Sequence, residues 1–317
     1  MTIQPDLTRR GFIQSAGIAT ATSLGMSSNL CFAKAESSML IIDCHAHIYG
    51  EDETKYPTIE KPYRPPKGKG TISHLKAEMK NSGVRHVTAI QTSTFYRFDN
   101  RFTSDSARDN KDFMAGVVTL DPDNPASPDM LERYVKEYNV RGMRSISAKS
   151  GKLDDPGVDK LWATAERLGI VINALVNRDK RKEVESLARR HPKLSVVIDH
   201  CLNLKAGPNL KATLKDMVAL AKLPNIHAKL TFIPTGTAQP FPCRDMHDAC
   251  RAVIDAYSPG RCVWGSDFPC ELWCPKISYS QHLKIFTHEM GLDQKTQEAV
   301  LGQTAFRLWF RPRGKPV

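Results

Sequence analysis

The chain has 317 residues, and its 45 Lys and Arg against 34 Asp and Glu give a formal net charge of +11. This length suffices for one large domain with a sizeable core. The basic residues are scattered and form no known nucleic-acid-binding motif, so we expect no nucleic-acid partner and favour small anionic molecules.

The first residues are typical of an exported precursor. Residues 8–13 (TRRGFI) form a twin-arginine signal, an uncharged Ala/Ser/Gly-rich stretch covers 15–32, and residues 33–35 (AKA) form a cleavage site. An ordinary N-terminal helix with a chance arginine pair is the alternative. We therefore predict a signal peptide over 1–35 that engages the twin-arginine translocation machinery, and a mature domain over 36–317. The expected location is periplasmic or secreted, without a membrane anchor.

Apolar runs alternate with amphipathic stretches about every thirty residues along the mature chain. Patterns typical of strands cover 39–43, 84–90, 113–120, 140–146, 170–175, 194–199, 226–230 and 261–265. Helical patterns cover 72–82, 103–110, 128–138, 157–168, 181–191, 210–223, 243–257 and a terminal region from 278 to 309. Gly83 and Gly169 follow two of these helices, and Pro192 stops a third. The composition of segment 49–69 predicts a long loop over a pocket mouth. The alternative is a disordered segment on the surface.

Eight strands alternating with helices fit an α/β protein with a single-domain (β/α)8 barrel. An open doubly wound sheet shows the same alternation, but the chain has neither a dinucleotide-binding glycine fingerprint nor a P-loop. The predicted first, sixth and eighth strands end in His45-Ala46-His47, Asp199-His200 and Ser266-Asp267. In a barrel these ends surround one pocket, whereas the first and last strands of an open sheet usually lie far apart. The motifs therefore favour the barrel.

The polar groups at these strand ends supply three imidazoles and one carboxylate. His45 and His47 are two residues apart, so they share one face of a strand. His45, His47, His200 and Asp267 are donors that suit zinc or another divalent ion, which would polarise a carbonyl. Asp267 can instead accept a proton from an attacking water. Strand histidines are often structural, so the prediction depends on the whole constellation.

The odd number of cysteines left in the mature domain argues against a disulfide framework. Cys44, Cys201 and Cys262 lie in or beside apolar strands, which predicts small core residues. Cys270 and Cys274 flank three residues of a loop and can form one disulfide.

These motifs together resemble the amidohydrolase superfamily. The sequences DCHAH (43–47), VRGMR (140–144), VIDH (197–200), WGSDFP (264–269) and GQTAFRL (302–308) are similar to its amidohydrolase-related branch of TIM-barrel hydrolases. That branch includes sugar and dicarboxylate lactonases. The resemblance covers nearly all of the mature chain, and it is more specific for the superfamily than for the reaction.

The chain departs from that family at two strands. No lysine or glutamate follows Gly142-Met143 on the fourth strand, and no histidine occurs on the fifth. The resemblance therefore implies at most one divalent ion, most simply zinc, or a metal-free site. It also makes Arg144 a clamp for a substrate carboxylate, because a planar guanidinium suits that task. Tyr49 and Asn173 are further candidates for substrate binding, although each, like Lys229, is more often structural.

The function predicted from these residues is hydrolysis of a lactone or similar cyclic ester or amide that bears a carboxylate. His200 and Asp267 are the expected catalytic residues, with Asp267 as the general base. One rival is a decarboxylase on the same barrel, although such members usually use a fifth-strand histidine. The other is a non-catalytic binding protein that kept the fold.

Overall fold

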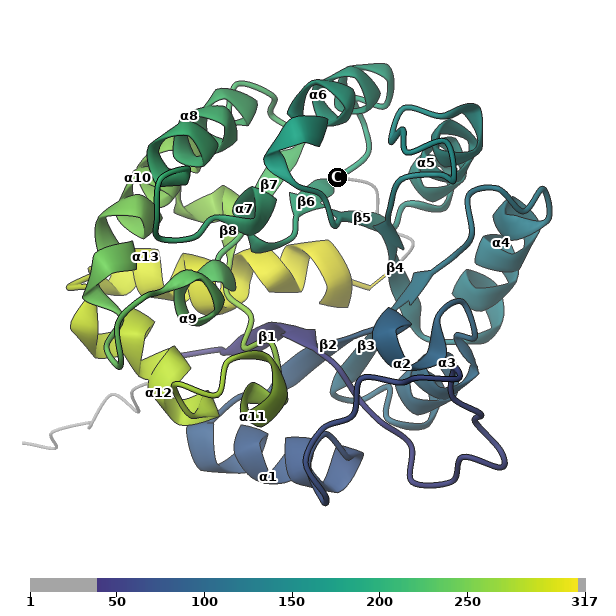
Figure 1. The fold of residues 1–317 in the computed structure, drawn as a ribbon, viewed down its shortest axis with the longest axis horizontal. Helices are drawn as coiled ribbons and strands as arrows, with labels where there is room; N and C mark the ends of the chain where they lie inside the picture. Colours follow the sequence, from purple (N-terminus) through teal and green to yellow (C-terminus); the bar gives the residue numbers. More distant parts are fainter. Residues whose placement is uncertain (1–38, 313–317) are drawn as a thin grey trace, which may run out of the picture. The chain divides into compact units, whose positions relative to one another are not determined.

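The computed structural model describes residues 39–312 and places eight parallel strands in the order β1 to β8. The strands form a ring with helices outside it (Figure 1). Cys44 N donates to Trp264 O at 3.0 Å and Ala46 pairs with Phe268, so the last segment of the ring returns to the first. The strands are β1 Ile42–Ala46, β2 His86–Ile90, β3 Met114–Thr119, β4 Val140–Ser145, β5 Val171–Ala174, β6 Val196–Ile198, β7 Ile226–Lys229 and β8 Cys262–Val263. The predicted (β/α)8 barrel is confirmed.

Helices follow the strands around the ring, and short turns interrupt several of them. The α-helices are α1 Ile72–Ser82, α2 Ser93–Tyr96, α3 Arg101–Asp109, α4 Ser127–Glu137, α5 Pro156–Leu168, α6 Arg181–Arg190, α7 His200–Asn203, α8 Leu210–Leu220, α9 Phe232–Gly236, α10 His247–Tyr257, α11 Cys270–Trp273, α12 Tyr279–Lys284 and α13 Gln294–Glu298. The 3-10 turns are η1 Arg178–Lys180, η2 Arg244–Met246 and η3 Pro259–Arg261, and the π-helical stretches are η4 Ile285–Glu289, η5 Ala299–Gln303 and η6 Phe306–Phe310. None of the described helices is both long and apolar enough to cross a membrane.

Local chemistry explains where several helices begin and end. Thr71 caps α1 by accepting a hydrogen bond from His74 N, and Asp155 caps α5 in the same way. Gly83 and Gly169 end these two helices with φ angles of 71° and 63°, which glycine adopts without steric cost. The predicted ends of both helices are therefore confirmed.

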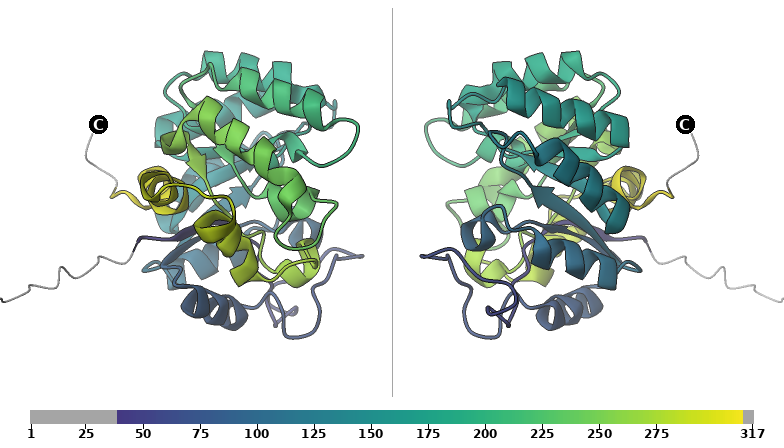
Figure 2. Two further views of the ribbon diagram at one scale, coloured as in Figure 1. Left: turned by 90° about the vertical axis from the view of Figure 1, so that its left-hand side faces the viewer. Right: turned by 90° about the vertical axis from the view of Figure 1, so that its right-hand side faces the viewer.

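The barrel interior is closed at the amino-terminal ends of its strands. Inward-facing residues such as Ile42, Val117 and Val263 form one buried cluster with Ala305 and Trp309 from the terminal helical region. That region lies across one end of the barrel in the side views (Figure 2). With this end filled by side chains, polar residues gather at the opposite end, where TIM-barrel sites are built.

Candidate active site

A bulge in β1 sends His45 into the barrel. Cys44 packs in the interior cluster, so simple alternation would send His45 outward. The pairing of β1 with β2 shifts register between Asp43 and Ala46, and such an irregularity re-aims the side chains that follow it. His45 and His47 then lie on the same side, as the sequence predicts, with their Nε2 atoms 3.2 Å apart.

Asp43 holds this bulge against the end of β8. Its Oδ1 accepts hydrogen bonds from His45 N at 3.0 Å and Ser266 N at 2.8 Å. Its Oδ2 accepts from Ser266 Oγ at 2.6 Å and Tyr279 Oη at 2.9 Å. All four bonds come from different groups around the turn, so Asp43 fixes the spacing between the ends of β1 and β8.

Asp267 is a buried carboxylate without a hydrogen-bond donor in the described part of the chain. Its Oδ1 lies 3.4 Å from His45 Nε2 and 3.8 Å from His47 Nε2. Burial raises the pKa of Asp267 from 3.8 to about 7, even though the charge of Arg144 opposes the shift. Gly265 allows this approach, because a Cβ there would lie 2.7 Å from His45 Cβ.

His200 opens a turn whose backbone is left-handed throughout. Residues His200 to Asn203 have φ angles of 51°, 50°, 62° and 54°, and Leu204 N donates to His200 O at 3.1 Å. Left-handed backbone costs non-glycine residues about 1–2 kcal/mol each, so the surrounding fold must impose this turn. His200 Nδ1 lies 2.8 Å from Thr231 Oγ1, which leaves Nε2 for the cavity. The ring lies 4.8 Å from that of His45.

The three imidazoles are neutral at neutral pH. Burial and the charge of Lys229 hold the pKa of His45 well below its usual range, and burial together with Arg144 does the same to the pKa of His47. Burial lowers the pKa of His200 to about 4. His47 Nδ1 donates to Ile90 O at 3.1 Å, so its Nε2 carries a lone pair toward the cavity.

A second carboxylate, Asp199, is ionised and paired with two cationic side chains. Lys229 Nζ lies 2.7 Å from Asp199 Oδ1, and Arg144 Nε donates to Oδ2 at 3.2 Å. Burial alone would raise the pKa of Asp199, but the charges of Lys229 and Arg144 overcome it and hold the pKa well below its usual range. Arg144 Nη2 also lies 2.9 Å from His45 Nε2, and Lys229 Nζ lies 3.3 Å from His45 Nδ1.

A cavity of about 330 Å³ opens above these groups. Its lining includes His47, Arg144, His200 and Asp267 from four strand ends, and Trp273 of α11 forms a further wall. The other lining residues are Ser93, Thr94, Leu175, Asn203 and Thr235. The Trp273 ring lies 5.3 Å from that of His47, so the aromatic wall stands directly beside the polar floor.

The loop from residue 49 to 69 reaches this wall. Tyr63 N donates to Thr94 O at 3.0 Å, and the ring of Tyr63 lies 5.2 Å from that of Trp273. The loop therefore lies at the cavity mouth, in line with the prediction from its composition.

Two predicted substrate-binding residues lie beside the cavity rather than in its lining. Tyr49 is 4% exposed and packs against Phe95, and burial raises the pKa of its hydroxyl. Asn173 is fully buried and donates to Asp199 Oδ1 at 3.3 Å. The loop disulfide that the sequence allowed is not formed: Cys270 and Cys274 are free buried thiols whose Sγ atoms both contact Ser266 O.

The ion pairs of Asp199 and the cavity wall formed by Trp273 were not predicted from the sequence, whereas Lys229 was expected to be a structural residue. A strand-period count would have placed Asp199 and Lys229 together, because Arg144, Asn173, Asp199 and Lys229 all fall on inward-facing positions near strand ends. No comparable pattern marks Trp273, since α11 is a four-residue helix in a loop.

The residues present fit a divalent ion. Ligand atoms of His45, His200 and Asp267 lie within 4.8 Å of one another. Lone pairs of His47 Nε2 and Asp267 Oδ1 also converge on His45 Nε2, and such atoms repel one another unless a proton or a cation lies among them. Arg144 Nη2 supplies one donor at this point, so an ion would share the space with a guanidinium.

Comparisons with known proteins agree on one family. The family profile described as Amidohydrolase matches residues 42–311. An L-fucono-1,5-lactonase of Burkholderia ambifaria is 30% identical over 201 residues, 62% of this chain and 68% of that protein. A 4-sulfomuconolactone hydrolase of Rhizobium radiobacter is 25% identical over 233 residues, 72% of this chain and 75% of that protein.

Solved structures share the fold. A crystal structure described as a probable 2-pyrone-4,6-dicarboxylic acid hydrolase from Acinetobacter baumannii has a TM-score of 0.73 at 18% identity, over 86% of this chain and 100% of that one. An amidohydrolase from Burkholderia multivorans with bound zinc has a TM-score of 0.68 at 24% identity, with the same coverage.

Proposed function

Because this chain belongs to the amidohydrolase family and is a hydrolase, we propose that it hydrolyses a lactone or similar cyclic ester that bears a carboxylate. The observation that carries the proposal is Asp267, a buried carboxyl without a hydrogen-bond donor among the described residues, with a pKa of about 7 beside three neutral imidazoles. A general base works best when its pKa lies near the working pH.

Asp267 takes the proton of the attacking water. The water oxygen forms a bond to the lactone carbonyl carbon as its proton passes to Asp267. The ring C–O bond then breaks, and protonated Asp267 returns the proton to the leaving alkoxide. The products are the open-chain acid and its hydroxyl group, so the step needs no other reactant. The small cavity suits a single ring, since ligand sites of about 300 Å³ are at the lower end of the usual range.

His200 acts on the carbonyl oxygen in one of two ways, which differ in the direction of one hydrogen bond. If the Thr231 hydroxyl donates to Nδ1, then Nε2–H donates to the developing oxyanion and no ion is needed. If Nδ1–H donates to Thr231, then Nε2 is free to ligate. A divalent ion held by His45, His47, His200 and Asp267 would supply Lewis-acid polarisation of the carbonyl. We propose zinc as the first choice, because nitrogen and oxygen donors suit it and a structural relative holds it.

Arg144 holds the substrate carboxylate in this proposal. Its Nε and Nη2 are bound to Asp199 and His45, but no hydrogen bond to Nη1 is found in the described residues. The side chain lines the cavity, so Nη1 is placed to donate to an anion.

The test is product analysis with a panel of carboxylate-bearing and neutral lactones, together with elemental analysis of the protein. We expect ring opening without carbon dioxide release, and at most one equivalent of metal. Carbon dioxide release would instead favour the decarboxylase, for which a 5-carboxyvanillate decarboxylase of Sphingomonas paucimobilis is a structural neighbour. Tight ligand binding with no turnover on the whole panel would favour a binding protein. Two equivalents of metal, both required, would contradict the single-ion site.

We also propose export by the twin-arginine route to the periplasm or beyond. The signal lies in residues 1–35, which fall outside the described part of the chain. Changing Arg9 and Arg10 to lysine should leave the precursor in the cytoplasm, because the translocation machinery recognises the paired arginines. Normal periplasmic levels of the doubly substituted protein, measured by cell fractionation, would contradict this proposal.

A further inference from the structure

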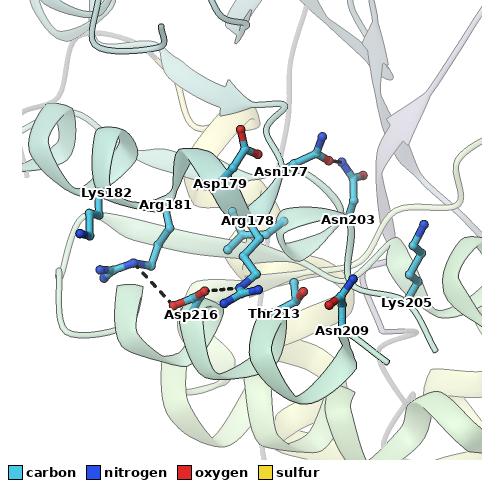
Figure 3. A pocket seen from close by; sticks show the side chains of 11 residues that line it. Asn177, Arg178, Asp179, Arg181, Lys182, Asn203, Lys205, Asn209, Thr213 and Asp216 are labelled. Atoms are coloured by element: carbon cyan, nitrogen blue, oxygen red, sulfur yellow. Dashed lines mark hydrogen bonds and ion pairs between the residues drawn. The ribbon is translucent and has the colours of Figure 1, made fainter. Parts of the chain in front are cut away.

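A second hollow, larger than the reaction cavity, lies beside it on the same face of the barrel. It has a volume of about 620 Å³ and is lined by the segment from β5 into α6 and by the segment from β6 into α8 (Figure 3). Its lining is almost entirely polar, with Leu202 as the exception. The proposed hydrolysis of a single ring uses none of this space.

The hollow and the reaction cavity share a rim. Asn203 lines both of them, and only one residue separates Leu175 of the cavity from Asn177 of the hollow. Asn203 Nδ2 donates to Asn177 Oδ1 at 2.5 Å, so the segments after β5 and β6 are joined at this rim. Figure 3 shows the two amides meeting at the edge of the hollow. A ligand that crosses the rim passes from His200 to the hollow over two amide groups.

The charge of the hollow is positive. Its lining carries four cationic side chains and two carboxylates, a surplus of two positive charges. Asp216 forms ion pairs with Arg178 at 2.6 Å and with Arg181 at 3.7 Å. Lys182 and Lys205 are exposed, and neither has an ion pair in the described part of the chain.

The lining of the hollow includes the hydroxyl group of Thr213, which has no hydrogen-bond partner among the described residues. Thr213 is 7% exposed and lines the hollow, and no hydrogen bond of its side chain is found in the described residues. It lies in the first turn of α8, where Asn209 makes no side-chain cap and no acidic residue occurs. The amino terminus of a helix favours negative charge, so this end adds to the potential set up by the lysines.

We propose that the hollow is a subsite for a second anionic group, carried by a substrate that extends beyond the lactone ring. The inference builds on the proposed function: the ring lies over Asp267 and Arg144, the linking part crosses the Asn177–Asn203 rim, and the distal anion lies in the hollow. Lys205 lies at the end of the hollow near Asn203 and Lys182 at the other end, so the positive potential extends over the whole hollow (Figure 3). The substrate class is therefore a lactone joined to a further acidic unit, such as a sugar lactone that carries a uronic acid.

Binding of non-hydrolysable probes tests the subsite without relying on turnover. The probes are an aldobiuronic acid whose reducing sugar has been oxidised to an aldonic acid, so that it carries a proximal and a distal carboxylate, and the matched aldobionic acid without the distal carboxylate. Calorimetry at low salt should show tighter binding of the aldobiuronic acid to the full mature protein. Rising salt should reduce the difference, because the lysines are exposed. Equal affinity for the two probes, or no binding of either, would overturn the inference.

Charge-reversal variants locate the effect. Lys182→Glu/Lys205→Glu should weaken binding of the aldobiuronic acid about tenfold, as expected when two exposed charges that line the hollow are reversed, and leave the aldobionic acid unchanged. The matched control is Lys111→Glu/Lys193→Glu, which changes net charge equally at exposed lysines in helix-to-strand loops on the opposite end of the barrel. Equal loss in both variants would show a general charge effect and overturn the subsite.

The outcome separates this inference from the proposed function. Lysine-dependent binding of the aldobiuronic acid in a protein that opens no lactone supports the subsite and rejects the hydrolysis. Hydrolysis of simple lactones with no preference between the two probes rejects the subsite and keeps the hydrolysis.

Discussion

Asp199 and Asp267 lie at the same mouth of the barrel, yet their surroundings are opposite. Asp199 meets Lys229, Arg144 and Asn173, and its pKa is held well below the usual range by the two cations. Asp267 meets imidazoles and no hydrogen-bond donor among the described residues, and burial raises its pKa to about 7. Groups whose environments separate their pKa values in this way take different roles. Asp199 holds the site together, and Asp267 is the carboxylate that the proposed mechanism uses as its base.

The largest expected effect is on turnover after Asp267→Asn. The amide keeps the shape of the side chain but cannot accept the proton of water, so kcat/KM for lactones should fall about 10²–10⁴-fold. The free energy of unfolding should not fall, because the substitution removes a buried charge that lacks a donor. Steady-state kinetics and urea unfolding of the same samples measure both. Near-normal turnover by folded Asp267→Asn protein would remove this residue from the mechanism.

Unlike Asp267→Asn, the substitution Lys229→Met should lower the free energy of unfolding. The substitution leaves Asp199 buried beside fewer positive charges, and breaking a buried ion pair costs about 3–5 kcal/mol of unfolding free energy. The double variant Lys229→Met/Asp199→Leu removes both charges and should regain part of that loss. Urea unfolding of the wild type, the single variant and the double variant gives the comparison. Equal instability of the two variants would mean that Lys229 stabilises the barrel by packing alone.

A smaller effect is expected after Arg144→Met, since Arg144 binds Asp199 directly and acts on Asp267 through its charge. Loss of the proposed clamp should reduce kcat/KM for an anionic lactone by about 2–4 kcal/mol in barrier terms, the scale of a broken charge-assisted contact. A neutral analogue should lose much less. The two substrates are measured with the same enzyme preparation, so partial unfolding affects both alike. If both substrates lose the same factor, then Arg144 is structural and the anionic substrate loses its main support.

The smallest effect is the opposite pH dependence of stability that the two carboxylates predict. The pKa of Asp267 is raised to about 7 in the folded state. Between about pH 4 and 7 this carboxyl is therefore ionised in the unfolded state but still protonated in the folded state, and the folded state loses stability as the pH rises through this range. Asp199 has a lowered pKa, so its contribution is present above pH 4 and is lost as the pH falls further.

Asp267→Asn isolates the first of these contributions. In chelator-treated protein, the unfolding free energy of Asp267→Asn relative to wild type should rise between pH 5 and 7 by about 1.4 kcal/mol per pH unit. A relative stability that stays constant over this range would show that Asp267 is ionised throughout, with an ordinary pKa.

The regular parts of the molecule were predictable because they depend on local pattern. The strands follow apolar runs, and His45, His47, His200 and Asp267 were found at the strand ends where a barrel gathers its polar groups. The irregular parts were not. The β1 bulge depends on the bonds that Asp43 makes to Ser266, more than 200 residues away, and no local signal reports such a contact.

The same reasoning applies to His200 and Asp199. The left-handed turn after β6 contains Cys201 and Leu202, which do not favour positive φ, so only the packed fold accounts for it. The pairing of Asp199 with Lys229 crosses two neighbouring strands and appears only when the strands are in register. Tyr49 was a candidate for substrate binding because it comes soon after the His45-Ala46-His47 motif. The strand ends at Ala46, however, and the ring of Tyr49 packs against Phe95.

The position of Trp309 ties the closing of the barrel to two segments that lie far apart in the sequence. This side chain completes the interior cluster that contains Ile42 of β1, and a Cβ added at Gly302 would clash with Leu40 O. The apolar floor of the barrel therefore stays open to water until η5 and η6 pack against the first strand. Contacts of such large sequence separation form slowly, because the entropy of closing a long loop is lost before the contacts repay it. We therefore expect the floor of the barrel to close late in folding, after neighbouring strands and helices have paired.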